Sequence, residues 1–506
     1  MADARELEIK LRLDPRDIEM FSSLEALGSA KPSRSRLHTV YFDDARRRLA
    51  EHGLELRVRT TVDRHLQTVK AGSGTSRGEW ESQIADETPS RESAAATPAK
   101  RFLKKQRPLA PVFDVHVERR SWKVARNGSE AAISLDSGEI ACGRRKQILA
   151  EAEFELKGGS PRLLFELAQE AIRRCDAPLS FVGKGLRGRR LAEGISDSPE
   201  QRIDLRLDAE ATVESAFQQI VAACLQQASI NEEILRQRPE SVEAIHGMRI
   251  AIRRLRAALS LFAEMIEGDD LGGLKRELKW MSDLLGAARD LDVLVAGPVR
   301  NVRLRHPDIE GLEELRDKSE ELRQAAHRGL NEAIHSERFR RLLLGIVEFA
   351  QAGAWSRDAS PERRKLRSVA IVVFAPEELD RRLRSICKKK SRVAIVGENE
   401  LDRHRVRIKA KKLRYIAEFL KSLARTRDYE KTSVALKKLQ STLGDVHDAG
   451  AAEQIVSRIL EKENSAEIAF AASILRGEFA APASSIEKAS AAHAELRRST
   501  PFWQRL

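Results

Sequence analysis

The chain has 506 residues, of which 42% are hydrophobic and 33% charged, with a formal net charge of +13. This length predicts two to four domains, and the basic balance indicates an anionic partner, such as nucleic acid, an acidic membrane surface or a phosphate compound. The four cysteines are widely spaced, which argues against a structural zinc site. The sequence shows no apolar leader and no run of 18 apolar residues, which argues against secretion and a membrane-spanning helix and predicts a cytoplasmic protein.

The first 195 residues carry the pattern of antiparallel strands. Apolar and polar residues alternate, as strands require, over residues 6–12, 54–59, 113–119 and 151–157. Turn residues occur at 72–74, 127–128 and 136–138, and helices are predicted near 15–27 and 161–175. Whole strand faces are charged, and the acidic and basic faces belong to different strands. We therefore expect a small barrel whose polar interior can enclose a metal-bound polyanion.

Charged residues on these strands supply both kinds of group that a metal-bound phosphate needs. Alternate residues of a strand share a face, so Glu6, Glu8 and Lys10 point to the same side. Two carboxylates can hold a hard divalent cation, and the neighbouring lysine can meet a phosphate oxygen. Arg57 and Arg59 form a basic row on another strand. Further charged residues of the same region are Lys70, Arg119, Asp136, Glu151, Glu153, Glu155, Lys184 and Arg187.

The order of these motifs over about residues 1–190 resembles the CYTH superfamily, also called triphosphate tunnel metalloenzymes. The resemblance is strongest to the bacterial inorganic triphosphatases, and it includes Tyr41–Asp43 and Arg77–Glu81. It implies an eight-stranded antiparallel tunnel that hydrolyses triphosphate with Mg²⁺ or Mn²⁺. The metal ligands it implies are Glu6, Glu8, Glu151 and Glu153, and the first two act with Lys10 in catalysis. The phosphate-binding residues it implies are Lys10, Arg57, Arg59, Lys70, Arg119 and Lys184.

A second domain is predicted after a short linker. Residues 196–205 contain Pro199 and few large apolar side chains, so we place the linker there, between domains at 1–195 and 206–500. Beyond it the apolar residues recur every three or four positions, which indicates helices. The whole chain is therefore predicted to join an α+β barrel domain to an all-α domain.

The helical region contains an internal repeat. The segment His246–Arg256 matches His404–Arg414, and Leu285–Asp290 matches Leu443–Asp448, both at an offset of 158 residues. Because two separate motifs share one offset, we expect two copies of one helical unit, at about 206–350 and 360–500.

Each copy of the repeat carries a basic stripe. An advance of about 100° per residue places four residues of each copy on one helix face: His246, Arg249, Arg253 and Arg256, then His404, Arg407, Lys411 and Arg414. Such a stripe repels itself unless an anion meets it, so we predict ligand binding. The alternative is a solvated face that is neutralised by Asp290, Asp292 or Asp448.

These repeated residues resemble the CHAD domain, a helical family named for its conserved histidines, over about residues 206–495. The resemblance implies two four-helix bundles related by pseudo-twofold symmetry, which bind inorganic polyphosphate in a basic groove. The implied contacts are the eight stripe residues together with Arg254 and Lys412. Lys411 and Lys412 replace the arginines of the first copy and lack their bidentate geometry, so we expect unequal contributions from the two copies.

Three other functions compete with this hypothesis: an adenylate cyclase of the same superfamily, a non-catalytic polyphosphate-binding protein, and a nucleic-acid binder. Nothing in the sequence marks an adenine pocket, and a simple polyanion clamp would need no acidic rows. Aromatic residues make up only 5% of the chain, which leaves few platforms on which bases could stack. We therefore expect tripolyphosphate and long-chain polyphosphate as partners, and neither a membrane nor a nucleic acid.

Overall fold

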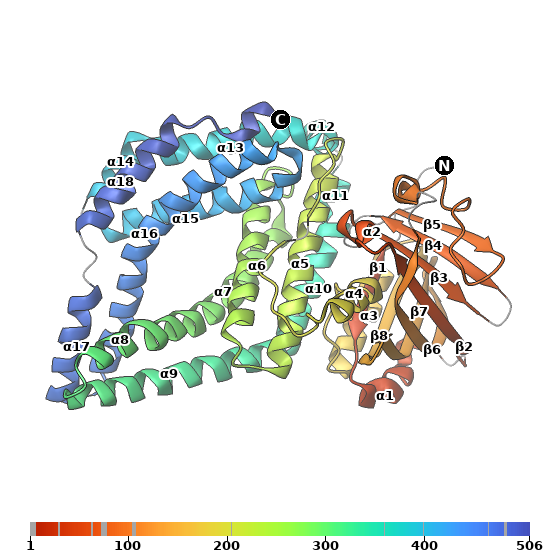
Figure 1. Ribbon diagram of the computed structural model, residues 1–506, viewed down its shortest axis with the longest axis horizontal. Helices are drawn as coiled ribbons and strands as arrows, with labels where there is room; N and C mark the ends of the chain where they lie inside the picture. Colours follow the sequence, from red (N-terminus) through yellow and green to blue (C-terminus); the bar gives the residue numbers. More distant parts are fainter. Residues whose placement is uncertain are drawn as a thin grey trace. The chain divides into compact units, whose positions relative to one another are not determined.

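The computed structural model describes residues 7–28, 31–61, 64–71, 78–103, 108–203, 205–358, 360–397, 399–463, 465–479 and 483–506. The chain forms two compact units (Figure 1). The first comprises Met1–Asp204, Val221–Ile234 and His335–Gly353, and the second comprises Leu205–Ile220, Leu235–Ile334 and Ala354–Leu506. Residues 196–203, which belong to the predicted linker, contain no helix or strand.

The first unit is built around one antiparallel sheet of eight strands, as predicted. The strands are β1 (Glu8–Arg12), β2 (Ser33–Asp43), β3 (Leu54–Thr60), β4 (His65–Ala71), β5 (Gly78–Ile84), β6 (Ala110–Arg126), β7 (Ser129–Cys142) and β8 (Arg145–Gly158). Their order across the sheet is β1-β8-β7-β6-β2-β3-β4-β5. The four alternating stretches of the sequence fall in β1, β3, β6 and β8, which confirms these strand predictions.

Short helices cover the convex face of the sheet beside β1 and β8. Helices α1 (Ile18–Ser22) and α3 (Arg162–Arg174) occupy the two predicted helical stretches. The Phe21 ring of α1 meets the Phe154 ring of β8 edge-on, with their centroids 6.0 Å apart. Both rings are fully buried, so the apolar half of the β8 alternation packs outside the curl, and its polar half, which includes Glu153, faces the interior. In β6 the arrangement is reversed, because the apolar residue Val115 lines the cavity.

One end of the interior is closed by helix α4 (Lys184–Glu193). Leu191 of this helix packs with Phe113, Ile140 and Leu149, which come from three neighbouring strands. These side chains lie on the concave face, where most of the remaining lining residues are charged. The apolar cluster therefore fixes α4 inside the curl and positions its first residue, Lys184, at the remaining cavity.

Two of the predicted turns can be compared with the structure, and the third, at 72–74, lies outside the described residues. Asn127 and Gly128 both have positive φ and form the tight turn between β6 and β7, as predicted. The turn predicted at residues 136–138 is wrong, because these residues lie inside β7. Gly138 is required there by a close approach: a Cβ at this position would lie 1.9 Å from the backbone oxygen of His116.

From residue 205 onward the described chain is helical, as predicted. Its α-helices are α5 (Val213–Gln237), α6 (Val242–Leu261), α7 (Asp269–Leu294), α8 (Arg300–Arg305), α9 (Glu310–His335), α10 (Glu337–Ala352), α11 (Ala354–Arg357), α12 (Pro361–Ser368), α13 (Ile371–Cys387), α14 (Lys389–Val396), α15 (Glu400–Phe419), α16 (Thr426–Leu460), α17 (Ala466–Phe479) and α18 (Ala483–Arg498). Within the described part of the chain, no helix is long and apolar enough to cross a membrane.

The internal repeat is visible in the helices of the second unit. Helix α15 has the same length as α6, and both of its bounds are displaced from those of α6 by 158 residues. The capping side chains, Ser241 and Asn399, have the same offset. Equivalent contacts recur as well, because Arg256 donates to Ser282, and Arg414, 158 residues later, donates to Gln440.

The close approach at Gly138 predicts a large difference between two glycine substitutions. Gly138→Ala should destabilise the first unit by about 1–3 kcal/mol, because the new methyl group must force β6 and β7 apart. Gly158→Ala in β8, where an added Cβ meets no atom within 4 Å, should change stability by less than about 1 kcal/mol. Urea unfolding of both variants measures this difference. Equal unfolding midpoints would rule out the close approach.

Candidate functional site

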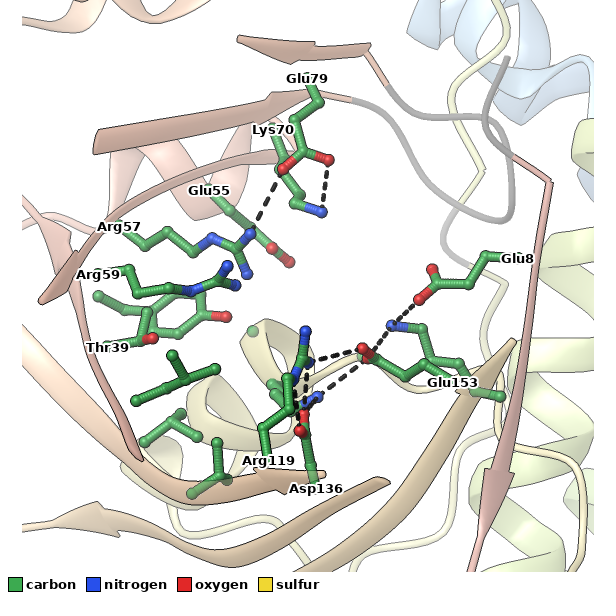
Figure 2. A pocket seen from close by; sticks show the side chains of 18 of the residues that line it. Glu8, Thr39, Glu55, Arg57, Arg59, Lys70, Glu79, Arg119, Asp136 and Glu153 are labelled. Carbon is green, nitrogen blue, oxygen red and sulfur yellow. Dashed lines mark hydrogen bonds and ion pairs between the residues drawn. The ribbon is translucent and has the colours of Figure 1, made fainter. Parts of the chain in front are cut away.

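The curled sheet encloses a cavity of about 560 Å³ (Figure 2). Among the described residues that line it, seven side chains are cationic and seven are carboxylates. The cations are Lys10, Arg57, Arg59, Lys70, Arg119, Lys157 and Lys184, and the carboxylates are Glu8, Glu55, Glu79, Glu81, Asp136, Glu153 and Glu155. A bare polyanion would meet as many negative groups as positive ones, whereas a polyanion carrying metal cations could satisfy both.

The structure brings most of the predicted barrel residues to this cavity. All six predicted phosphate-binding residues line it, together with Glu8 and Glu153. Glu6 lies outside the described residues. Glu151 is fully buried beneath the lining, whereas its strand neighbours Glu153 and Glu155 face the cavity.

Lys184 holds three carboxylates together at the inner end of the cavity. Its ammonium lies 2.8 Å from Asp136 and 2.9 Å from Glu153, and it also contacts Glu151. These carboxylates can each place an oxygen within 4.8 Å of the others, so the ammonium takes the place that a cation would fill. Burial opposes the charge on Lys184, but the three carboxylates outweigh it and raise its pKa well above the usual value. One oxygen of Glu151, Oε2, keeps no hydrogen-bond partner within the described chain.

Glu153 connects this cluster to β1 and β6. Its Oε1 accepts a hydrogen bond of 2.7 Å from Lys10, and its Oε2 accepts one of 2.9 Å from Arg119. Arg119 also donates two hydrogen bonds, of 2.6 and 2.7 Å, to Asp136. Burial opposes ionisation of Glu153, but Lys10, Lys184 and Arg119 together hold its pKa well below the usual value. Glu153 is therefore a carboxylate at neutral pH.

A second pair of carboxylates lies at the edge of this cluster. Glu8 and Glu155 are directly opposite each other on β1 and β8, and both line the cavity. Lys10 lies 3.0 Å from Glu8, and Lys157 contacts Glu155. Glu8 and Glu155 thus add two carboxylates from neighbouring strands to the lining, and oxygen ligands of this kind suit a hard divalent cation.

Cations of β3 and β4 dominate another part of the lining (Figure 2). Glu79 lies 2.8 Å from Lys70 and 3.4 Å from Arg57. No described residue forms an ion pair with Arg59. Burial and then the charges of Arg57 and Arg119 lower the pKa of Arg59 to about 10. Its positive charge is thus poorly compensated, and an anion in the cavity would relieve the repulsion.

The predicted basic stripes of the second unit meet where α6 and α15 pack together. The pKa of Arg253 is lowered by burial and by the charges of Arg249 on its own helix and Arg407 on α15, although Tyr415 partly compensates. The pKa of His246 is lowered by burial and then by Arg289, Arg249 and Arg253. Cations from both copies of the repeat are therefore close enough to repel one another.

Comparison with known proteins assigns both regions of the chain. The family model of the CYTH domain matches residues 4–176, and that of the CHAD domain matches residues 219–457. The chain combines a CYTH domain with a CHAD domain. An uncharacterised protein of Mycobacterium tuberculosis is 23% identical to it, over 93% of this chain and 92% of that protein.

Two further relatives each match one of the domains. An inorganic triphosphatase of Haemophilus influenzae is 28% identical over 36% of this chain and 54% of its own length. The crystal structure of the CHAD domain from the plant Ricinus communis is 29% identical, with a TM-score of 0.50. The match covers 59% of this chain and 98% of the Ricinus communis chain.

Not every residue predicted for the CHAD domain is available to a ligand. Arg254 is buried and donates hydrogen bonds of 2.6 and 3.3 Å to the two carboxylate oxygens of Glu418, so it ties α6 to α15. Arg249 lies 3.0 Å from Asp290, which is one of the acids considered in the alternative interpretation. Asp292 instead contacts His327 and Arg323. The side chain of Asp448 lies outside the described residues.

The other residues predicted for the CHAD domain lie along the same two helices. Lys412 has a pKa that is lowered by burial and then by Arg256, Arg382 and Lys275. The guanidinium of Arg414 lies over the Tyr415 ring, 4.5 Å from its centroid. Along α15, Arg407 is buried, whereas His404, Lys411 and Lys412 are partly exposed.

Several residues of both sites were given no role by sequence reasoning. Glu79 of the CYTH domain holds both Lys70 and Arg57, and Asp136 holds Arg119 and Lys184. The signal for Glu79 is the alternation in β5, which places Glu79 and Glu81 at the cavity. In the CHAD domain, Arg289 was missed although it lies inside the second repeated motif.

The two arginines of β3 predict opposite effects on stability. Arg59→Gln removes a buried charge without an ion-pair partner, so it should stabilise the free protein by about 1–2 kcal/mol. Arg57→Gln removes a partner of Glu79 and should destabilise the protein by about 1–3 kcal/mol. A polyanion that binds in this cavity, tested with tripolyphosphate, should stabilise both variants much less than the parent protein against heat. Differential scanning calorimetry with and without tripolyphosphate measures both effects. If Arg59→Gln is less stable than the parent protein, the charge of Arg59 is compensated in the free protein, and this interpretation of the cavity is wrong.

Proposed function

We propose that the CYTH domain is a metal-dependent inorganic triphosphatase and that the CHAD domain binds polyphosphate. The observation that carries the first part is Arg59, a poorly compensated charge beside Arg57 and Arg119. The same cavity is lined by Glu8, Glu153 and Glu155, which we call the carboxylate wall. The cations provide a place for phosphate oxygens, and the carboxylates provide a place for metal. The named activity of the Haemophilus influenzae relative supports the same reaction.

The carboxylates proposed to hold Mg²⁺ or Mn²⁺ are Glu8, Glu153 and Glu155. The predicted ligand Glu6 lies two residues before Glu8 in the sequence. Glu151 could join them through Oε2, because Lys184 contacts only its other oxygen. A divalent cation at these carboxylates would neutralise phosphate charge and lower the pKa of a bound water molecule. The bound cation would also offset the negative charge of the carboxylate wall, so that a highly charged anionic substrate could bind beside it.

The side chains of the cavity can then orient the substrate for attack by water. Arg57, Arg59 and Lys70 are proposed to bind phosphate oxygens and to stabilise the charge that develops as the terminal P–O bond breaks. Lys10 already contacts Glu8 and Glu153, and its third hydrogen can be directed to a phosphate oxygen. The described lining contains no Ser–His or Cys–His pair that would activate a side-chain nucleophile, and we propose direct attack by water.

The proposed activity predicts that tripolyphosphate is hydrolysed faster than ATP, and only with Mg²⁺ or Mn²⁺. The reason is the charged lining, whose described aliphatic members are only Leu37, Val115 and Val117. Phosphate release should be measured from tripolyphosphate, long polyphosphate, ATP and thiamine triphosphate, with and without metal. Formation of cyclic AMP and pyrophosphate from ATP would instead establish the cyclase alternative.

The same assay tests the carboxylate wall. Glu8→Gln combined with Glu155→Gln keeps the shape of the wall and should lower kcat/KM for tripolyphosphate roughly 10²-fold or more at a fixed metal concentration. Higher metal concentrations should partly restore activity, because the loss is one of metal affinity. The control combines Glu118→Gln with Glu130→Gln, two exposed positions that do not line the cavity. Equal activity in the two double variants would exclude this wall as the metal site.

The proposal for the CHAD domain rests on the mutual repulsion of Arg253 and Arg407, which belong to different copies of the repeat. A linear polyanion bound between α6 and α15 would offset the repulsion that Arg249 and Arg407 exert on the charge of Arg253. Arg249, Arg289 and His246 lie close to the same point and extend the positive surface.

This proposal predicts a local effect of charge removal on polyphosphate binding. Arg253→Gln combined with Arg407→Gln should weaken binding of the full chain to long polyphosphate at least tenfold and should reduce its dependence on salt concentration. The control combines Arg381→Gln with Arg405→Gln, because both side chains are exposed, at 67% and 73%, and pair with acids on their own helices. Binding is measured by titration at several salt concentrations. An equal loss in both double variants would show a diffuse basic surface without a defined site.

A further inference from the structure

The convex face of the sheet carries a second group of metal-ligating side chains, on the outside of the tunnel wall. His38 of β2 and the residues Asp114 and His116 of β6 each offer a ligand atom, and these atoms lie within 4.8 Å of one another. Side chains alternate along a strand, so Thr39 and Val115 face the cavity while their neighbours face outward. The proposed triphosphatase reaction therefore uses none of these three residues.

The sheet itself holds the three side chains together. His38 and His116 are directly opposite each other in the β2–β6 pairing, and Asp114 shares their face because it lies two residues before His116. The two imidazole rings stack with their centroids 4.2 Å apart and their planes within 8° of parallel, so one ring must rotate before both nitrogens can point at a single ion. The Asp114 carboxylate lies 3.4 Å from Nε2 of His116. Two ligands on one strand and a third on its neighbour form a three-point site on a rigid support.

The state of the side chains also suits a ligand. Nε2 of His38 is buried and has no hydrogen-bond partner within the described chain. A buried ring nitrogen without a partner destabilises the protein, so a ligand that binds this atom is favoured. The side chains of His116 and Asp114 are 51% and 41% exposed, which leaves the group open to an ion from solution.

We propose that His38, Asp114 and His116 form a binding site for a transition-metal ion of the zinc type, separate from the carboxylates of the tunnel. Two imidazoles and one carboxylate are a common ligand set for Zn²⁺, and the fourth position would remain for water. Mg²⁺ prefers oxygen ligands alone, so the two sites differ in the metal they select.

An ion at this site would join the two parts of the sheet. The β2–β6 pairing is the link between the strands β6, β7, β8 and β1 on one side and β2, β3, β4 and β5 on the other. The ion would add a second connection across this link, on the reverse of the cavity wall. Because it binds only the folded sheet, it would stabilise the protein by mass action.

The experiment uses the metal-free, full-length protein with Mg²⁺ in excess, so that the tunnel carboxylates are occupied. Zn²⁺ affinity is measured by competition with a chromophoric chelator, and thermal unfolding is followed with and without Zn²⁺. The parent protein should bind Zn²⁺ and unfold at a higher temperature when it is present. His38→Gln combined with His116→Gln should weaken binding at least tenfold and remove this shift.

Two control variants distinguish Zn²⁺ binding at this site from binding elsewhere on the protein. His52→Gln combined with His306→Gln removes the same number of histidines from exposed positions and should leave Zn²⁺ binding unchanged. Glu153→Gln alters the tunnel and should also leave it unchanged. The proposal is overturned if the His38 and His116 double variant binds Zn²⁺ like the parent, or if Glu153→Gln removes the binding. Metal-free unfolding curves establish that each variant is folded.

Discussion

The contact of Lys184 with three carboxylates, Asp136, Glu151 and Glu153, is the interaction on which the first unit depends. Asp136 and Glu151 are fully buried, and charged groups of this kind are tolerated inside a protein only when they are paired. Lys184 is the first residue of α4, so the same contact holds the helix end at the cavity. One ammonium group thus compensates the buried carboxylates and, together with the apolar cluster around Leu191, holds α4 at the closed end of the tunnel.

Charges are well paired in one part of the cavity and poorly paired in another, so an anionic ligand would bind preferentially in the second part. Glu153 has three cations around it, whereas Arg59 has no ion-pair partner among the described residues. A ligand gains little where charges are already paired and much where a charge is poorly compensated. The free protein therefore gives up some stability at the position where the proposed substrate would bind, as often occurs in functional sites.

The extent to which sequence predicted this structure depends on how local each signal is. Alternation within a strand placed Arg57, Arg59 and Glu153 on the cavity side, because that pattern requires only neighbouring residues. Pairing between distant residues left no such trace, so the buried role of Glu151 beneath Lys184 could not be predicted. Arg254 shows the same limit: its charge suggested a ligand contact, but its partner is Glu418, 164 residues away in the chain. A glycine at a close approach, as at position 138, looks like a turn residue in sequence.

The repeated helices α6 and α15 have a consequence for the kind of chain they can hold. They present similar groups twice, and inorganic polyphosphate is itself a repetition of one unit. Moving such a polymer along the two helices by one phosphate brings an identical group to every cation, so no single alignment is preferred. A surface of this kind would bind the polymer tightly and still allow it to slide along the two helices.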